Sequence, residues 1–179
     1  MKRADMVERA RRCIGHGCTY KLGAGGVKPD AVWPWKVNPE KNVGECDCSG
    51  FVAWCLGTSR LRRDVEAFWK MNGGWIETSA IARDAETTHA LFGEVSPDQA
   101  LPGDVVVYGD KGGHQGHVGM VVSVSPTPDP WDGIRVVHCS SGNFKRSGDA
   151  IQETGAGLWK KADGLVARYL PAMVSEPVT

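Results

Sequence analysis

From residue 104 onward, apolar residues recur with the period of β-strands, and this change of period most constrains the fold. Four such segments stand between clusters of Gly, Pro and Asp, at 104–109, 117–124, 134–139 and 165–170. The residues before them follow helical patterns, so helices come first in the chain and strands come after. We therefore predict an α+β fold, in which N-terminal helices pack on one face of a central antiparallel sheet.

Several helices are predicted ahead of these strands. Apolar residues spaced by three and four predict an amphipathic helix over 3–15. An N-cap at Asp47 and a nearly all-apolar run predict a buried helix that ends at Gly57. A charged helix over about 60–71 and a helical piece over about 78–85 follow. Acidic residues follow the basic cluster 60–63 at helical spacing, so we interpret this cluster as a solvated helix face.

The 179 residues fit one domain, and we predict a single domain over 1–179 with a helical insertion at about 58–100. The segment 18–45 is rich in Gly and Pro, which predicts an irregular surface loop. The last residues, 175–179, are expected to form a frayed tail.

The charge balance excludes some classes of partner. Acidic and basic residues number 21 each, which argues against nucleic acid or an anionic membrane surface as the main partner. The N-terminus lacks the apolar run of a secretory signal, and no run approaches the roughly 18 residues of a membrane span. We expect a protein that is made in the cytoplasm.

The stretch Asp-Cys-Ser-Gly-Phe-Val at 47–52 places Cys48 in the first turn of the buried helix. Unpaired N–H groups and a nearby imidazolium lower the pKa of such a thiol to about 3.5 to 7.5, so we expect a resting thiolate. The Cys48 backbone N–H would also donate to the oxyanion of an attacked carbonyl. Cys48 is therefore a candidate nucleophile.

Two histidines are candidates for its base and for the residue that orients the base. In the segment 117–124, the even-numbered residues are apolar and should meet the core, which leaves His117 on the opposite face. Gly119 beside it has no side chain that would block a substrate. If residue 117 or 119 pairs with His138 on an antiparallel neighbour, both histidines lie on one face.

The six cysteines fall below the density of a disulfide scaffold, and most are expected to be reduced, with Cys13 and Cys55 in the core. Cys46 either packs inward or, if it is exposed, lets oxidants form a Cys46–Cys48 bridge. A structural zinc site is an alternative that lacks the usual paired CxxC motifs. It would draw on the cysteines together with His114, His117 and His138.

These motifs resemble those of the NlpC/P60 family of cysteine peptidases, which cleave peptide stems of bacterial cell walls on a papain-like fold. The matching segments are Tyr-Lys-Leu-Gly-Ala-Gly-Gly at 20–26, the stretch 47–52, Leu-Pro-Gly-Asp-Val-Val at 101–106, His-Val-Gly at 117–119, and His138. The resemblance implies that Cys48 attacks, that His117 is base and then acid, and that His138 orients His117. It also implies that Tyr20 lines the substrate cleft.

Further substrate-binding candidates are Asp47 and Ser49, beside the nucleophile, and three tryptophans of the loops. Trp33, Trp35 and Trp75 are candidate cleft walls, although loop tryptophans form small local cores as often.

By this resemblance, the chain is expected to be a cysteine endopeptidase that cleaves peptidoglycan stem peptides between γ-D-glutamate and the diamino acid. It would act as a monomer without metal or organic cofactor. The alternatives are an N-acetylmuramoyl-L-alanine amidase, an acyltransferase or thioesterase of the same superfamily, and a non-catalytic phage-tail or wall-binding component. Without a Sec signal, we expect delivery to the wall or periplasm as a phage lysin or as an injected effector that has an immunity protein.

Overall fold

The computed structural model describes residues 1–40 and 42–173, so the predicted frayed tail at 175–179 lies outside the described residues. Its centre is a six-stranded antiparallel sheet in the order β4-β9-β5-β6-β7-β8. In chain order these strands are β4 (Phe92–Val95), β5 (Val105–Tyr108), β6 (His117–Val124), β7 (Ile134–Cys139), β8 (Ile151–Gly155) and β9 (Leu165–Tyr169). All four predicted strands are present. The strands β4 and β8 were not predicted.

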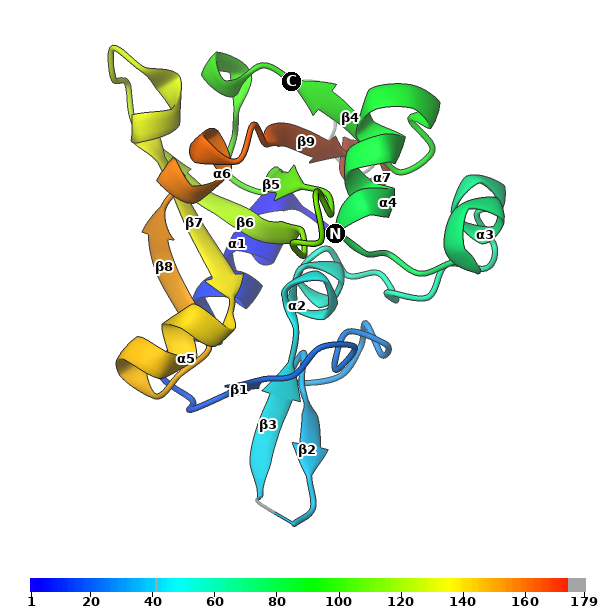
Figure 1. Ribbon diagram of the computed structural model, residues 1–179, viewed down its shortest axis with the longest axis vertical. Helices are drawn as coiled ribbons and strands as arrows, with labels where there is room; N and C mark the ends of the chain where they lie inside the picture. The colour runs from blue at the N-terminus through cyan, green and yellow to red at the C-terminus, as the bar shows by residue number, and fades with distance from the viewer. Residues whose placement is uncertain (41, 174–179) are drawn as a thin grey trace.

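Helices cover the sheet as predicted, which confirms the α+β, papain-like architecture. The helices α1 (Arg3–Arg12) and α2 (Cys48–Cys55) pack against β6 and β7 on one face (Figure 1). On that face, the even-numbered β6 residues Val118, Met120 and Val122 enter the larger core, as their pattern predicts. Val124, the last of the series, packs against the smaller core instead, because the pairing register shifts between Val121 and Ser123. No helix of the described residues is long and apolar enough to cross a membrane.

The opposite face is also covered, by a smaller core centred on Trp159. This residue belongs to the short helix α6 (Gly157–Lys161), and its side chain is fully buried against Val121 and Val136. Burial on both faces holds the central strands rigidly, which fixes the positions of side chains at the strand ends.

All eight residues of α2 are buried, as its apolar composition predicts. The helix can approach the loop before it closely because both contact points are glycines. A Cβ added to Gly50 would lie 2.6 Å from the Ala24 carbonyl oxygen, and one added to Gly26 would lie 2.2 Å from the Gly50 oxygen. Gly26 also has a φ of +71°, which disfavours other residues.

The segment 18–45 is not the wholly irregular loop that its composition predicts. It contains β1 (Thr19–Tyr20) and β2 (Lys36–Asn38), and these pair with β3 (Val43–Cys46) in a small sheet of order β1-β3-β2. The β2–β3 hairpin projects from the body below α2 in Figure 1. Pairing of Tyr20 with Cys46 brings β1 next to the start of α2.

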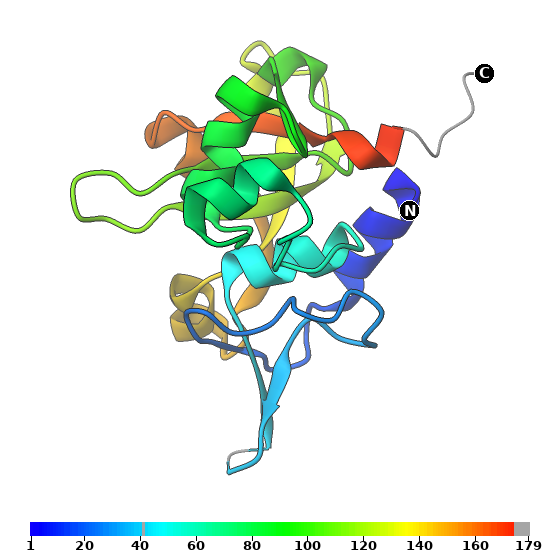
Figure 2. The ribbon, with the colours of Figure 1, turned by 90° about the vertical axis from the view of Figure 1, so that its right-hand side faces the viewer.

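The segment 58–100 contains helices and the edge strand β4. Its elements before β4 are α3 (Glu66–Asn72), α4 (Thr78–Arg83) and a π-helical turn over Asp84–Thr88, and a 3-10 turn over Pro97–Gln99 follows β4. Figure 2 shows α3 and α4 side by side in front of the sheet, with the loop 109–116 projecting at the left. The helix predicted from about 60 begins only at Glu66, because residues 60–62 run extended to contact 74–76. The remaining helical elements are a 3-10 turn over Pro130–Gly133, α5 (Ser141–Ser147) and α7 (Leu170–Met173).

Candidate active site

The N-terminus of α2 meets the start of β6, and this junction brings Cys48 and His117 together. Asp47 is the N-cap, as predicted, and its Oδ1 accepts the Gly50 N–H at 2.7 Å. The backbone N–H of Val118, the residue directly after His117, donates to the Cys48 thiol. The Cys48 backbone N–H has no acceptor among the described residues, so it remains available to a ligand.

His117 and His138 are hydrogen-bonded across neighbouring strands. Met120 pairs with Val137, so His138 stands opposite Gly119, which is one of the two predicted registers. His117 Nε2 lies 2.7 Å from His138 Nδ1. Gly119 serves this contact rather than substrate access, because a Cβ there would lie 3.0 Å from the His138 Cβ and 2.4 Å from a Val136 methyl.

Three further residues hold the histidine pair in place. His138 Nε2 lies 3.1 Å from Thr154 Oγ1 on β8. The buried Asn143 donates to the carbonyl oxygens of His138 and Ala150, both at 3.1 Å. Trp159 stacks on the His117 ring and donates from its indole to the His117 carbonyl at 3.3 Å. The orientation of both imidazoles is therefore fixed from several sides.

Arg60 corrects the interpretation of the basic cluster as a solvated helix face. Its side chain is 3% exposed and donates to Asp47 Oδ2 at 3.0 Å and to Ser49 Oγ at 2.8 Å. It also donates to the carbonyls of Ala24 and Gly25 and lies over the Trp75 ring. The Asp47 carboxylate compensates for the burial of the Arg60 charge. The spacing of residues along the chain does not reveal this ion pair, because its two partners are distant in sequence.

Asp47 and Ser49, both predicted to bind substrate, are engaged within the protein. The second carboxylate oxygen of Asp47 accepts from Gly23 N at 2.6 Å as well as from Arg60. The Ser49 hydroxyl lies between Asp47 and Arg60. These contacts favour a role in holding the turn around Cys48 over direct contact with a ligand.

Burial governs the protonation of the catalytic candidates. It raises the pKa of the Cys48 thiol to about 12, and the nearby Asp47 carboxylate adds to this effect. Burial lowers the pKa of His117 to about 4 and that of His138 to about 3. The unliganded site therefore favours a neutral thiol and neutral imidazoles. The expectation of a resting thiolate is wrong, because burial outweighs the N–H donors around the sulfur.

Two neighbouring hollows contain the catalytic candidates, and Tyr20, Gln115 and Gly116 line both. The first, which we call the acidic hollow, has a volume of about 320 Å³ and contains Cys48. Its charged lining residues are Asp47, Glu77, Asp110 and Arg60. The second, which we call the histidine hollow, has a volume of about 480 Å³ and contains both histidines. Tyr20 thus lies beside both Cys48 and the histidines, and its contact with substrate stays a prediction.

The predicted cleft tryptophans separate into two groups. Trp75 is 38% exposed and lines the acidic hollow. Trp33 and Trp35 do not reach either hollow. Their rings stack at 4.7 Å, and the His16 ring packs on Trp33 at 4.5 Å. They form a small local core against the main one, which is the alternative that their loop position allowed.

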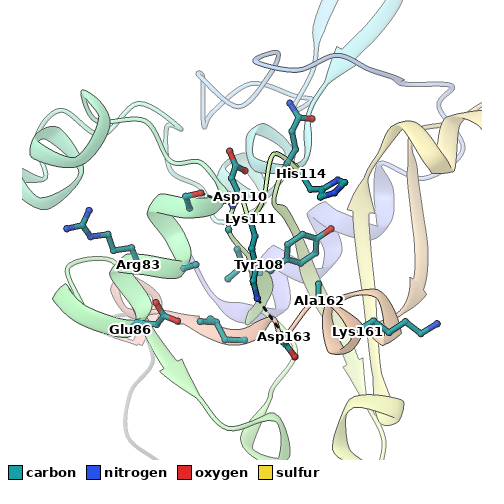
Figure 3. A pocket seen from close by; sticks show the side chains of 15 residues that line it. Arg83, Glu86, Tyr108, Asp110, Lys111, His114, Lys161, Ala162 and Asp163 are labelled. Atoms are coloured by element: carbon teal, nitrogen blue, oxygen red, sulfur yellow. Dashed lines mark hydrogen bonds and ion pairs between the residues drawn. The ribbon is translucent and has the colours of Figure 1, made fainter.

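A third and larger hollow, of about 850 Å³, lies on the other side of the loop 109–116. Figure 3 shows Tyr108 within it and Lys111 reaching toward Asp163, an ion pair of 3.8 Å. Arg83 and Glu86 stand at its opposite side. It shares Tyr108, Asp110 and Gln115 with the other hollows, but none of the predicted catalytic residues lines it.

The other cysteines are buried away from both hollows. Cys46 is fully buried and hydrogen-bonds with Cys139, so it packs inward and does not face Cys48. Cys13 and Cys55 lie in the core, as predicted. Over residues 1–40 and 42–173, no three His, Cys, Asp or Glu side chains are arranged to hold a metal ion. The zinc alternative therefore gains no support from the geometry.

Sequence reasoning missed several residues of this site. Arg60 and Thr154 are the most important, followed by Asn143, Arg146 and Gln115. Thr154 lies on an unpredicted strand, and the others belong to segments whose polar residues also suit a surface. The chain offers no local signal for them, because their contacts join segments far apart in the sequence.

The fold and the site together define a papain-like cysteine hydrolase. A family model described as the CHAP domain matches residues 37–143, which is more than half of the chain. The protein therefore belongs to the CHAP domain family, a family of cysteine- and histidine-dependent hydrolases related to NlpC/P60. It is a peptidoglycan hydrolase, either an amidase or an endopeptidase. No curated protein matches the chain.

Proposed function

We propose that the protein is a peptidoglycan endopeptidase that uses Cys48, His117 and His138 as a catalytic triad. The observation that carries the proposal is the 2.7 Å contact between His117 Nε2 and His138 Nδ1, at the strand start that touches Cys48. With Nε2 engaged, Nδ1 is the only ring nitrogen of His117 left to exchange a proton with the thiol.

The hydrogen bonds fix which tautomers such a triad needs. His117 can accept a proton at Nδ1 only if Nε2 carries the hydrogen and donates to His138 Nδ1. His138 must then carry its own hydrogen on Nε2 and donate to Thr154 Oγ1, which lies 3.1 Å away. Asn143 Nδ2 also lies 3.5 Å from His138 Nε2, but its two hydrogens have shorter contacts of 3.1 Å with the His138 and Ala150 carbonyls, which is compatible with this arrangement.

Because the Cys48 thiol and the His117 imidazole are both neutral, attack by the sulfur and transfer of its proton occur together. His117 Nδ1 takes the Cys48 proton as the sulfur adds to the carbonyl carbon, and the Cys48 N–H donates to the oxyanion. The imidazolium then protonates the leaving nitrogen, which yields a free amine and a thioester. Water, deprotonated by His117, hydrolyses the thioester to a carboxylate and restores the thiol.

The positions of the two hollows support a proposed place for each half of the substrate. The acid that protonates the leaving nitrogen is His117, so the leaving residue occupies the histidine hollow. The acyl part then lies in the acidic hollow, where Asp47, Glu77 and Asp110 outnumber Arg60. An acyl part that ends in a free amine suits this charge.

This charge pattern favours an endopeptidase over an amidase. In a stem peptide already separated from muramic acid, cleavage between γ-D-glutamate and the diamino acid places L-alanyl-γ-D-glutamate, with its free amine, in the acidic hollow. Cleavage between muramic acid and L-alanine would instead place an uncharged sugar there. The charge in the hollow therefore supports the γ-D-glutamyl to diamino acid bond.

Digestion of defined muropeptides tests the proposal. From these muropeptides, wild type is expected to release the peptide that begins with the diamino acid and to leave muramoyl-L-alanyl-γ-D-glutamate, both identified by mass spectrometry, and Cys48→Ala is expected to release neither. Cys55→Ala, a buried cysteine at the far end of α2, serves as the control and is expected to cleave. Release of intact stem peptide from muramic acid would instead identify an amidase. Binding without any cleavage by wild type would favour the non-catalytic alternative.

The remaining predictions concern the setting of this activity. Action at the wall or periplasm after delivery by a phage or a secretion system stays a prediction, as do an immunity protein and a monomeric state.

A further inference from the structure

The histidine hollow contains one permanent charge, and it is positive. Arg146, on α5, lines the hollow together with both histidines. No Asp or Glu is among the residues that line it. Burial keeps His117 and His138 neutral, so the guanidinium dominates the electrostatic potential there.

Most donors of the Arg146 guanidinium are unused. One Nη2 hydrogen goes to Asn143 Oδ1 at 2.6 Å, and within residues 1–40 and 42–173 no carboxylate forms an ion pair with Arg146. A guanidinium has five N–H donors in a flat fork, which matches the two oxygens of a carboxylate. The bond to Asn143 holds one edge of the fork and leaves the rest to face a ligand.

The two hollows therefore differ in the sign of their charge. Carboxylates predominate in the acidic hollow, and Arg146 alone supplies a charge in the histidine hollow. A substrate that spans Cys48 in the favourable direction carries an amine on its acyl side and a carboxylate on its leaving side.

We propose that Arg146 binds the carboxylate of the amino acid that leaves as the amine. The inference rests on the proposed function, because it takes His117 as the acid that marks the leaving side. It adds a selection for substrates whose leaving residue carries a free carboxylate next to the scissile nitrogen. Amidation of that carboxylate would then protect the bond.

A pair of substrates isolates this contact. L-alanyl-γ-D-glutamyl-diamino acid tripeptides are prepared with the terminal α-carboxyl group either free or as the carboxamide. For wild type, we expect kcat/KM to be roughly tenfold higher for the free acid, the discrimination typical of one charge-assisted hydrogen-bonded pair. Arg146→Gln is expected to bring the ratio close to one, and Arg146→Lys is expected to keep part of the preference.

The ratio of kcat/KM for the free acid to kcat/KM for the carboxamide distinguishes a role of Arg146 in substrate binding from a role in holding the catalytic residues. Arg146 also contacts Asn143, which holds the His138 backbone, so its replacement can slow catalysis. A slower catalytic step lowers both rates alike and cancels in the ratio. Lys145→Gln, an exposed neighbour that does not line the hollow, is the matched control and should retain the wild-type ratio.

Each outcome bears on one of the two proposals. Equal rates for both peptides with wild type, or an unchanged ratio in Arg146→Gln, would overturn the role of Arg146 while leaving the endopeptidase in place. Cleavage of neither peptide by wild type would overturn the proposed function and the inference with it.

Discussion

At the scale of single residues, the site depends on neutral side chains in defined tautomers. Burial disfavours charge on both His117 and His138, so in the proposed triad hydrogen-bond direction takes the role that an ion pair has in more exposed triads. Thr154 sets the direction of the hydrogen bonds that run through His117 and His138. Its hydroxyl can accept from His138 while donating toward the Gly155 carbonyl. A hydroxyl can act in both ways at once.

Replacing Thr154 should therefore affect catalysis more than binding. Thr154→Val keeps the shape but removes the acceptor, so His138 would move its hydrogen to Nδ1 and no longer accept from His117. We expect kcat to fall by roughly tenfold to a hundredfold with little change in KM, whereas Thr154→Ser should retain activity. Nitrogen NMR of labelled histidine would report the tautomer directly. Wild-type kcat in Thr154→Val, or an equal loss in both variants, would contradict this role.

Arg60 shows why the residue scale is the hardest to predict from sequence. Its basic neighbours and the acidic residues after them fit a solvated helix, yet its side chain is almost wholly buried on Asp47. A buried guanidinium is stable only with a carboxylate and carbonyl partners, and these come from 47 and 24–25. Those partners come together only when the loop 23–26 packs against α2.

At the scale of elements, the position of Cys48, the proposed nucleophile, depends on contact between one helix and one loop. Asp47 caps α2, and this much follows from sequence because capping is local. The position of the loop does not follow from the sequence, since it depends on contact between the backbones of Gly26 and Gly50. The first turn of α2, with Cys48 in it, is held from both sides.

A single methyl group at this contact should disturb the site. Gly50→Ala would place its Cβ 2.6 Å from the Ala24 oxygen, so the loop must move away from α2. Overpacking of this kind costs about 1 to 3 kcal/mol, and we expect both a lower midpoint of thermal unfolding and weaker activity. Gly157→Ala is the matched control, because that helical position has no atoms within 4 Å. Equal thermal midpoints for the two variants would contradict the close packing.

The antiparallel pairing of β6 with β7 was partly predictable. Alternation in β6 indicates which residues enter the larger core, and two registers place His138 on the face of His117. The choice between them depends on packing, because only the register opposite Gly119 leaves room for Val136, His138 and Trp159. Trp159 belongs to a helix that the sequence pattern did not reveal.

At the scale of the whole molecule, the two buried histidines make stability depend on pH. Their pKa values fall to about 4 and about 3 in the folded protein, from the value of about 6.5 that applies when they are exposed. Between these values the unfolded chain binds more protons, so acid favours unfolding. Each histidine should remove up to about 1.4 kcal/mol of stability per pH unit as the pH falls below about 6.5.

Urea unfolding at several pH values between 7 and 5 would measure this slope, in a range where most carboxylates stay ionised. We expect the free energy of unfolding to decrease steadily over that range in wild type. His138→Gln should flatten the slope, and His114→Gln, in the exposed loop 109–116, should leave it unchanged. The same slope in all three proteins would mean that the buried pair does not take up protons on unfolding.

The sequence by itself determined the features that depend on neighbours in the chain. These are the capped, buried helix that carries Cys48, the four strands with clear alternation, and the order of Cys48, His117 and His138 along the chain. Only the tertiary structure decided which distant groups meet: Arg60 with Asp47, Thr154 with His138, and charges of opposite sign in two neighbouring hollows. The physical reason is that periodicity and capping act over a few residues, whereas burial, pKa and hydrogen-bond direction depend on everything packed around a group.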